Sequence, residues 1–190
     1  MAGKPVSLLT SAVLKDFVIL LLRIYNSFLY MNHLFFALLH SLGLSHKKLA
    51  LIPPEKVGNF YESVNIQKLL QIGIIEDIAM KIVDKKSTLN VERVERLLHE
   101  KNIRIIHRDD AEYPQLLINI SDAPTILYVR GKLPDHDALL SVVGSRRHSS
   151  YAQSCLEKIL PDLIRSGYTI VSGGAYGIDS LAHEITLKYT

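Results

Sequence analysis

The stretch SVVGSRRHSSYAQS, residues 141–154, decides how this chain folds. A short apolar segment runs into Gly144, then come serines, two arginines and a histidine, and an amphipathic pattern begins. A strand that ends in glycine just before a helix is typical of the parallel sheets of α/β proteins. The stretch either delivers a phosphate group to the start of a helix or is a polar turn.

The sequence downstream repeats this arrangement. After residue 149 the expected order is helix, strand and helix, over residues 150–167, 168–174 and 177–190. Alternating strand and helix predicts a parallel sheet with crossover helices. Pro161 should kink or break the first of these helices, and Gly167 is placed to end it.

Both strands run into a glycine loop, and parallel strands place such loops at the same edge of a sheet. Glycine removes the Cβ that would hold a ligand off the backbone, and a helix start favours an anion. Arginine adds charge-assisted bonds to phosphate oxygens. One loop alone is equally compatible with a tight turn, whereas two converging loops favour a phosphate site. The candidate residues are Gly144, Ser145, Arg146, Arg147, Ser172, Gly173, Gly174 and Gly177.

Other residues with chemical potential have simpler explanations. Asp179 fits a carboxylate that balances a helix dipole, and His183 follows it by one helical turn. Tyr151 and Tyr176 are candidates for stacking on bases or for ordinary packing. Cys155 is expected to be a small apolar helix residue. The sequence shows no catalytic spacing of nucleophile and base and no metal-ligand cluster, so we expect no cofactor.

The composition is that of a globular protein: the 190 residues are 48% hydrophobic and 22% charged. A net charge of +3 is compatible with a polyanionic partner without requiring one. The single cysteine makes a reducing cytoplasm the expected compartment.

The apolar segment at residues 17–39 has about the length of a membrane span, but polar residues interrupt it. The interrupting residues are Arg23, Asn26, Asn32 and His33. We expect buried helices here, or a non-native extension upstream of a start at Met31, rather than a membrane anchor.

Three regions follow from these patterns. Residues 1–30 are an apolar extension of uncertain status, and residues 31–100 have the helical spacing of a small all-helical domain. Its last helix should begin near Asn90, a favourable cap. Residues 101–190 form the α/β part, which opens with two strands at residues 103–108 and 125–131.

Residues 143–183 resemble the DprA/Smf family of DNA-processing proteins. The family pattern is VGSR, then S-x-Y-G, then G-x-x-I-V-S-G-x-A-x-G-I-D-x-x-A-H, and this chain reads VGSRRHSSYAQS followed by GYTIVSGGAYGIDSLAH. Residues 111–133 are similar to the family's preceding segment, and the helices from residue 31 resemble its SAM-like domain. Ala152 replaces a frequent glycine and Tyr176 a frequent arginine, which leaves more of any phosphate binding to Arg146 and Arg147.

The resemblance implies a Rossmann-like parallel sheet preceded by a SAM-like domain. It also implies a protein that binds single-stranded DNA in a basic pocket, protects incoming DNA and passes it to RecA during natural transformation. Such a protein is not an enzyme. Arg146 matches the family's DNA-contacting arginine, and the glycines and serines of both loops would line the pocket.

The family continues beyond the second glycine loop, whereas this sequence stops at Thr190. We therefore expect a fragment with an incomplete Rossmann-like sheet, for which the homodimer implied for full-length members is in doubt. Two alternatives stay open. One is a nucleotide phosphoribohydrolase-like enzyme of the lysine-decarboxylase-like Rossmann type, and the other is a non-functional remnant or membrane-tethered interaction protein.

Overall fold

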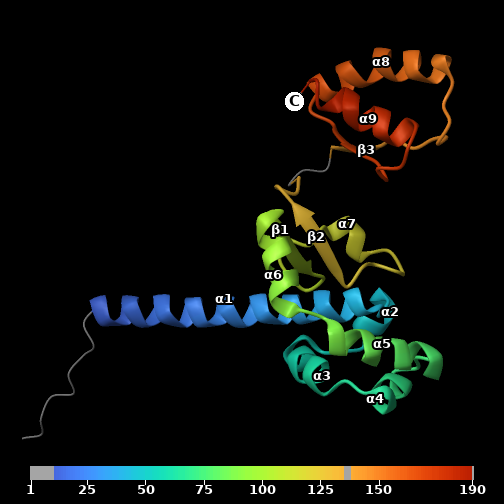
Figure 1. Ribbon diagram of the computed structural model, residues 1–190. Helices are drawn as coiled ribbons and strands as arrows, with labels where there is room; N and C mark the ends of the chain where they lie inside the picture. The colour runs from blue at the N-terminus through green and yellow to red at the C-terminus, as the bar shows by residue number, and fades with distance from the viewer. Residues whose placement is uncertain (1–10, 135–137, 190) are drawn as a thin grey trace, which may run out of the picture. The chain divides into compact units, whose positions relative to one another are not determined.

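The computed structural model describes residues 11–134 and 138–189, with side chains from residue 26 onward. The chain divides into two compact units, Met1–Lys132 and Leu133–Thr190, which are described separately below (Figure 1). The first unit is mainly helical and carries a pair of antiparallel strands. The second has two parallel strands and two helices.

The helices of the first unit surround one apolar core. The long helix α1 supplies much of that core through its carboxyl-terminal part, where Leu34, Phe36 and Leu38 are fully buried. The unit's helical elements are α1 (Ser11–Leu42), α2 (His46–Leu49), η1 (Pro54–Lys56), α3 (Val57–Ser63), α4 (Ile66–Gln71), α5 (Glu76–Thr88), α6 (Val91–Glu100) and α7 (Gln115–Ile118). The regular elements between residues 31 and 100 are all helical, and residue 30, the expected boundary, lies within α1. Residues 1–10 of the expected extension lie outside the described residues.

Asparagine caps begin two of these helices. The Asn90 side chain accepts a 2.6 Å hydrogen bond from the backbone N–H of Arg93, which confirms the expected start of α6. Asn65 caps α4 in the same way, through a 2.9 Å bond from Lys68. Each cap satisfies a backbone donor that a helix start would otherwise leave without a partner.

The two strands expected at the start of the α/β region are present, but they belong to the helical unit. β1 (Ile103–His107) pairs antiparallel with β2 (Ile126–Arg130), and the buried Ile126 is part of the helical core. Thr125 donates both its N–H and its hydroxyl to His46, at 3.2 and 2.7 Å. Because these contacts join the strand pair to α2, the compact unit ends after Lys132 and not after residue 100.

The second unit confirms the expected parallel sheet with a crossover helix. β3 (Leu139–Ser141) lies parallel to β4 (Thr169–Val171), with Leu140 opposite Ile170, and α8 (Ser150–Arg165) connects them. The last helix, α9 (Ile178–Thr186), packs against α8 (Figure 1). This arrangement is the one expected of a small Rossmann-like sheet.

Helices cover one face of this sheet. Ile170 is buried against α8 and α9, and Leu140 and Val142 pack against the same cluster. The residues that alternate with them face the other way, so that Val143 is 75% exposed. A doubly wound sheet carries helices on both faces, and the described residues of this unit provide helices for one face.

Pro161 does not break its helix. α8 continues from Ser150 to Arg165, with Leu160, Pro161 and Ile164 all buried. Burial of this stretch offsets the hydrogen bond that proline removes. Gly167 follows the helix at φ 89°, the left-handed conformation expected of a residue that ends a helix.

The amino-terminal apolar segment is part of helix α1 and does not form a separate element. Residues 17–39 all lie in α1, and in the part of the chain that the structure describes no helix combines the length and the apolar character needed to cross a membrane.

Candidate nucleic-acid interface

The two glycine loops meet at the carboxyl ends of β3 and β4, as the parallel arrangement requires. The backbone N–H of Ile178, at the start of α9, donates a 3.1 Å hydrogen bond to the carbonyl of Ser145 in the first loop. The sequence-based expectation that both loops lie at one edge of the sheet is therefore confirmed. Together they form a single surface, called the loop surface below, made of residues 143–149 and 172–177.

Two of the glycines let the loops pack against each other. A Cβ on Gly144 would lie 2.6 Å from a side-chain carbon of Ile178. A Cβ on Gly177 would lie 2.7 Å from the backbone of Arg146, and Gly177 also has φ 90°. Glycine at these two positions is needed for loop packing, a role that the sequence pattern did not reveal.

Gly174 lies beside open space. Its φ is 68°, and a Cβ there would meet nothing within 4 Å. Among the described residues, the backbone N–H groups of Gly173 and Gly174 have no hydrogen-bond partner. Exposed N–H groups on a turn that a ligand can approach closely are suited to an anion.

The serines of both loops use their hydroxyl groups within the protein. Ser145 Oγ donates to the carbonyl of Arg147 at 2.8 Å and accepts from the Arg147 N–H at 3.1 Å. Ser172 Oγ donates to the carbonyl of Val142 at 2.7 Å and so ties the end of β4 to the end of β3. These serines shape the loop surface, and their hydroxyl protons are not available to a ligand in this conformation.

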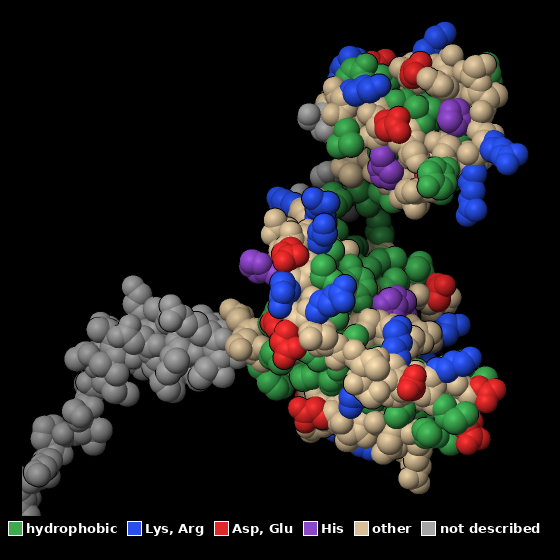
Figure 2. Space-filling model, in the orientation of Figure 1, with side chains coloured by type: hydrophobic (Ala, Val, Ile, Leu, Met, Phe, Trp, Pro, Cys, Tyr) green, Lys and Arg blue, Asp and Glu red, His purple; other side chains and the backbone are tan. Residues whose placement is uncertain are grey.

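Arg146 and Arg147 give the loop surface its charge. Both arginines are exposed, and neither makes an ion pair within the described residues. Residues 141–156 and 166–178 contain no aspartate or glutamate. Figure 2 shows basic side chains projecting from one edge of the second unit, next to hydrophobic ones. The local field therefore favours an anionic ligand.

The start of α8 adds to that field. Ser149 caps the helix by accepting a 3.3 Å hydrogen bond from the Ala152 N–H, and the first turn carries no acidic residue. The partial positive charge of a helix start is thus directed toward the loop that holds the arginines.

Asp179 and His183 do not form a pair. Asp179 is only 7% exposed in the first turn of α9, and its Oδ2 would lie 3.0 Å from a Cβ on Gly173. Within the described residues no ion pair joins it to His183, which is half-buried. The carboxylate faces a helix start, the arrangement expected of a dipole-balancing residue.

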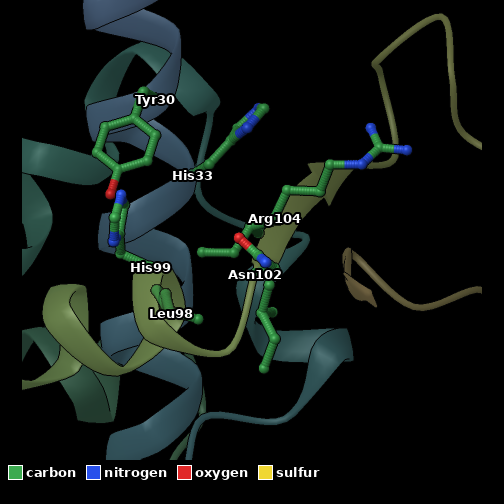
Figure 3. Close-up of a pocket in the computed structure, with 8 residues that line it drawn as sticks. Tyr30, His33, Leu98, His99, Asn102 and Arg104 are labelled. Carbon is green, nitrogen blue, oxygen red and sulfur yellow. The ribbon is translucent and has the colours of Figure 1, made fainter. Parts of the chain in front are cut away.

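A pocket of about 340 Å³ lies in the first unit, between α1, α6 and β1 (Figure 3). Tyr30 and Arg104 line it, but Tyr30 Oη donates to Glu95 at 3.3 Å and Arg104 pairs with Glu112. In Figure 3 the Arg104 guanidinium points away from the other labelled side chains. Two polar side chains of this pocket, Tyr30 and Arg104, thus already have protein partners, and no sequence pattern indicated the pocket.

Metal ligation would require a cluster of titratable side chains among the described residues. Residues 11–134 and 138–189 contain no group of three or more histidine, cysteine, aspartate or glutamate side chains placed to hold an ion. His33 and Asp110, 3.2 Å apart, and the stacked His33 and His107 rings come closest to a titratable cluster. Burial lowers the pKa of His107 against the opposing effect of Asp109 and Asp110.

Comparison with known proteins gives a family match that includes both glycine loops. Residues 104–190 match the family described as DNA recombination-mediator protein A. Protein Smf of Synechocystis is 31% identical over 128 residues, which are 63% of this chain and 32% of the relative. Protein Smf of Escherichia coli is 39% identical over 92 residues, 48% of this chain and 25% of the relative. The chain thus spans about a quarter to a third of the length of these curated relatives.

A solved structure shares the fold. The crystal structure of DNA processing protein A from Streptococcus pneumoniae superimposes with a TM-score of 0.54 at 24% identity. The superposition covers 80% of this chain and 53% of that one. At this level of identity the likeness concerns the fold and supports the assignment of the small parallel sheet as Rossmann-like.

Proposed function

Because the chain belongs to the DprA/Smf family of DNA-processing proteins, we propose that its second unit binds single-stranded DNA at the loop surface. One observation carries the proposal: Arg146 and Arg147 are exposed on a loop that packs directly against a second glycine loop. The residues of this surface include no aspartate or glutamate, the nearby Asp179 carboxylate is largely buried, and open backbone N–H groups border the arginines, an arrangement that suits a phosphodiester chain.

The groups available for binding are the guanidinium groups and the backbone. Arg146 and Arg147 would neutralise phosphates, since arginine presents a fork of donors that matches phosphate oxygens. The N–H groups of Gly173 and Gly174 would bind a phosphate that approaches over the open side of Gly174. Ser145 and Ser172 would act indirectly by holding the loop shape.

In the cell we propose a role in processing DNA during natural transformation. The chain would bind and protect incoming single strands in the cytoplasm and help to transfer them to RecA, without catalysing a reaction. Dimerisation, implied by the resemblance for full-length members, would belong to the same role. Two further relatives, from Bacillus subtilis (30% identical) and Streptococcus pneumoniae (40% identical), are named DNA processing protein DprA, and these names support the DNA-processing part of the proposal.

Equilibrium binding tests the proposal. The 190-residue chain is titrated into a labelled oligonucleotide of deoxythymidine, and anisotropy is followed at several salt concentrations. Binding should weaken linearly in log–log form as salt rises, with a slope near −0.7 per phosphate neutralised. Absence of binding at low salt would overturn the proposal.

Competitors make the result specific. Unlabelled single strands should displace the probe, whereas a nucleoside monophosphate should not, because it offers one phosphate to a surface with several donors. Displacement by the mononucleotide at similar concentration would favour a nucleotide-binding enzyme instead. Equal displacement by heparin would indicate a general polyanion surface and count against a DNA site.

A further inference from the structure

Tyr176 is the most exposed of the large apolar side chains in the described residues. Its side chain is 85% exposed, and it lies in the second glycine loop between Gly174 and Gly177. No hydrogen bond or ring contact joins it to another described residue. Its ring therefore contributes little to the core of this unit.

The backbone that carries Tyr176 is held on both sides. On the amino-terminal side, the carbonyl of Ala175 accepts from the N–H and the hydroxyl of Ser180, at 3.0 and 2.6 Å. On the carboxyl-terminal side, Gly177 packs on the backbone of Arg146 and Ile178 donates to Ser145. An exposed aromatic ring on a fixed loop binds a flat ligand with little loss of backbone freedom.

Tyr176 also lies next to the charged loop. The residue that follows it, Gly177, packs directly against the backbone of Arg146. A nucleotide bound to the Arg146 guanidinium by its phosphate would bring its base within the region of Tyr176. In a single-stranded nucleic acid, stacking recognises the base and charge neutralisation recognises the phosphate.

We propose that Tyr176 forms a stacking platform for one base of a single strand whose phosphate is bound by Arg146. The proposal rests on the DNA-binding function proposed above and adds a base contact to it. Stacking on tyrosine tolerates any base, so the site would bind without sequence preference. Tyr151, also exposed, is a weaker candidate, because its phenol interacts with Cys155 one turn along α8.

A tryptophan reporter tests the stacking directly. The sequence contains no tryptophan, so Tyr176→Trp creates a single tryptophan, which can be excited selectively over the tyrosines. Its fluorescence should be quenched when oligodeoxythymidine binds. Tyr168→Trp is the matched control: Tyr168 is also exposed but precedes β4, at the opposite end of the strand from the loop surface. Its emission should not change.

Affinity measurements give an independent readout. Tyr176→Ala should weaken binding about tenfold and leave the salt slope unchanged, because stacking neutralises no phosphate. Tyr176→Phe, which keeps the ring, should bind within about twofold of the natural chain. On an abasic oligonucleotide of equal length, Tyr176→Ala and the natural chain should bind alike.

The outcomes separate the two proposals. If the natural chain binds no single-stranded DNA, the proposed function fails and the stacking proposal fails with it. If the chain binds, yet the tryptophan at position 176 is not quenched and Tyr176→Ala keeps full affinity, only the stacking proposal is overturned.

Discussion

The N–H of Ile178 donates to the carbonyl of Ser145, and through this bond two loops from different βα units become one surface. The contact is possible because Gly144 and Gly177 lack side chains. The same geometry that positions Arg146 for a ligand is therefore also a stability element of the second unit. Substitutions at the packed glycines test stability, and substitutions at the exposed arginines test binding.

Gly177→Ala should strongly destabilise the second unit. The new Cβ would meet the backbone of Arg146 and would sit on a residue with φ 90°, so the expected loss is on the order of 2–4 kcal/mol. Urea unfolding measures it. Gly167→Ala is the matched control, with φ 89° and nothing within 4 Å of the added Cβ. It should lose only about 1 kcal/mol, and equal losses would show that packing between the loops is unimportant.

Ser172→Ala should lower the stability of the second unit without changing the salt dependence of DNA binding. Its hydroxyl donates a 2.7 Å bond to Val142 in a partly buried position, worth about 1 kcal/mol. Unfolding and DNA titration on the same variant give both quantities. A flatter salt slope would mean that Ser172 acts on phosphate directly. Ser154→Ala, on the exposed surface of α8, is the neutral control.

Acid should weaken the first unit through His46. Burial lowers the pKa of His46, and the neighbouring His40 lowers it further. The Nδ1 of His46 accepts a hydrogen bond from the Thr125 N–H. The unfolded chain thus takes up this proton at higher pH than the folded one does. Stability is complete above about pH 6.5 and is lost as pH falls toward the lowered pKa of the folded state.

The measurement is urea unfolding at pH 5.5 and 7.5. His46→Asn offers a carbonyl oxygen to Thr125 and does not titrate, so it should reduce the difference between the two pH values. Part of the difference should persist, because burial also lowers the pKa of His107. An unchanged difference in His46→Asn would exclude His46 as its source.

Local signals in the sequence predicted several elements correctly. Asn90 could be identified as a helix cap because a short polar acceptor stands directly before an amphipathic pattern. The parallel pairing of β3 with β4 followed from the alternation of strand and helix. The convergence of the glycine loops then followed from the parallel direction of the strands.

Contacts between distant residues could not be predicted in this way. Thr125 and His46 are 79 positions apart, and their bonds attach the antiparallel strand pair to the helical unit. Likewise the sequence shows a glycine at position 144 but not that Ile178 fills the space beside it. These outcomes depend on tertiary packing, which local patterns do not encode.

The salt dependence of DNA binding by Arg146→Ala tests the central claim most directly. If Arg146 neutralises one phosphate, the log–log slope should become shallower by about 0.7, and affinity at low salt should fall. Arg165→Ala removes the same charge at the far end of α8, where Arg165 pairs with Asp162 at 3.0 Å. That control should keep the natural slope. A slope and an affinity unchanged in Arg146→Ala would contradict the assignment of the loop surface to DNA.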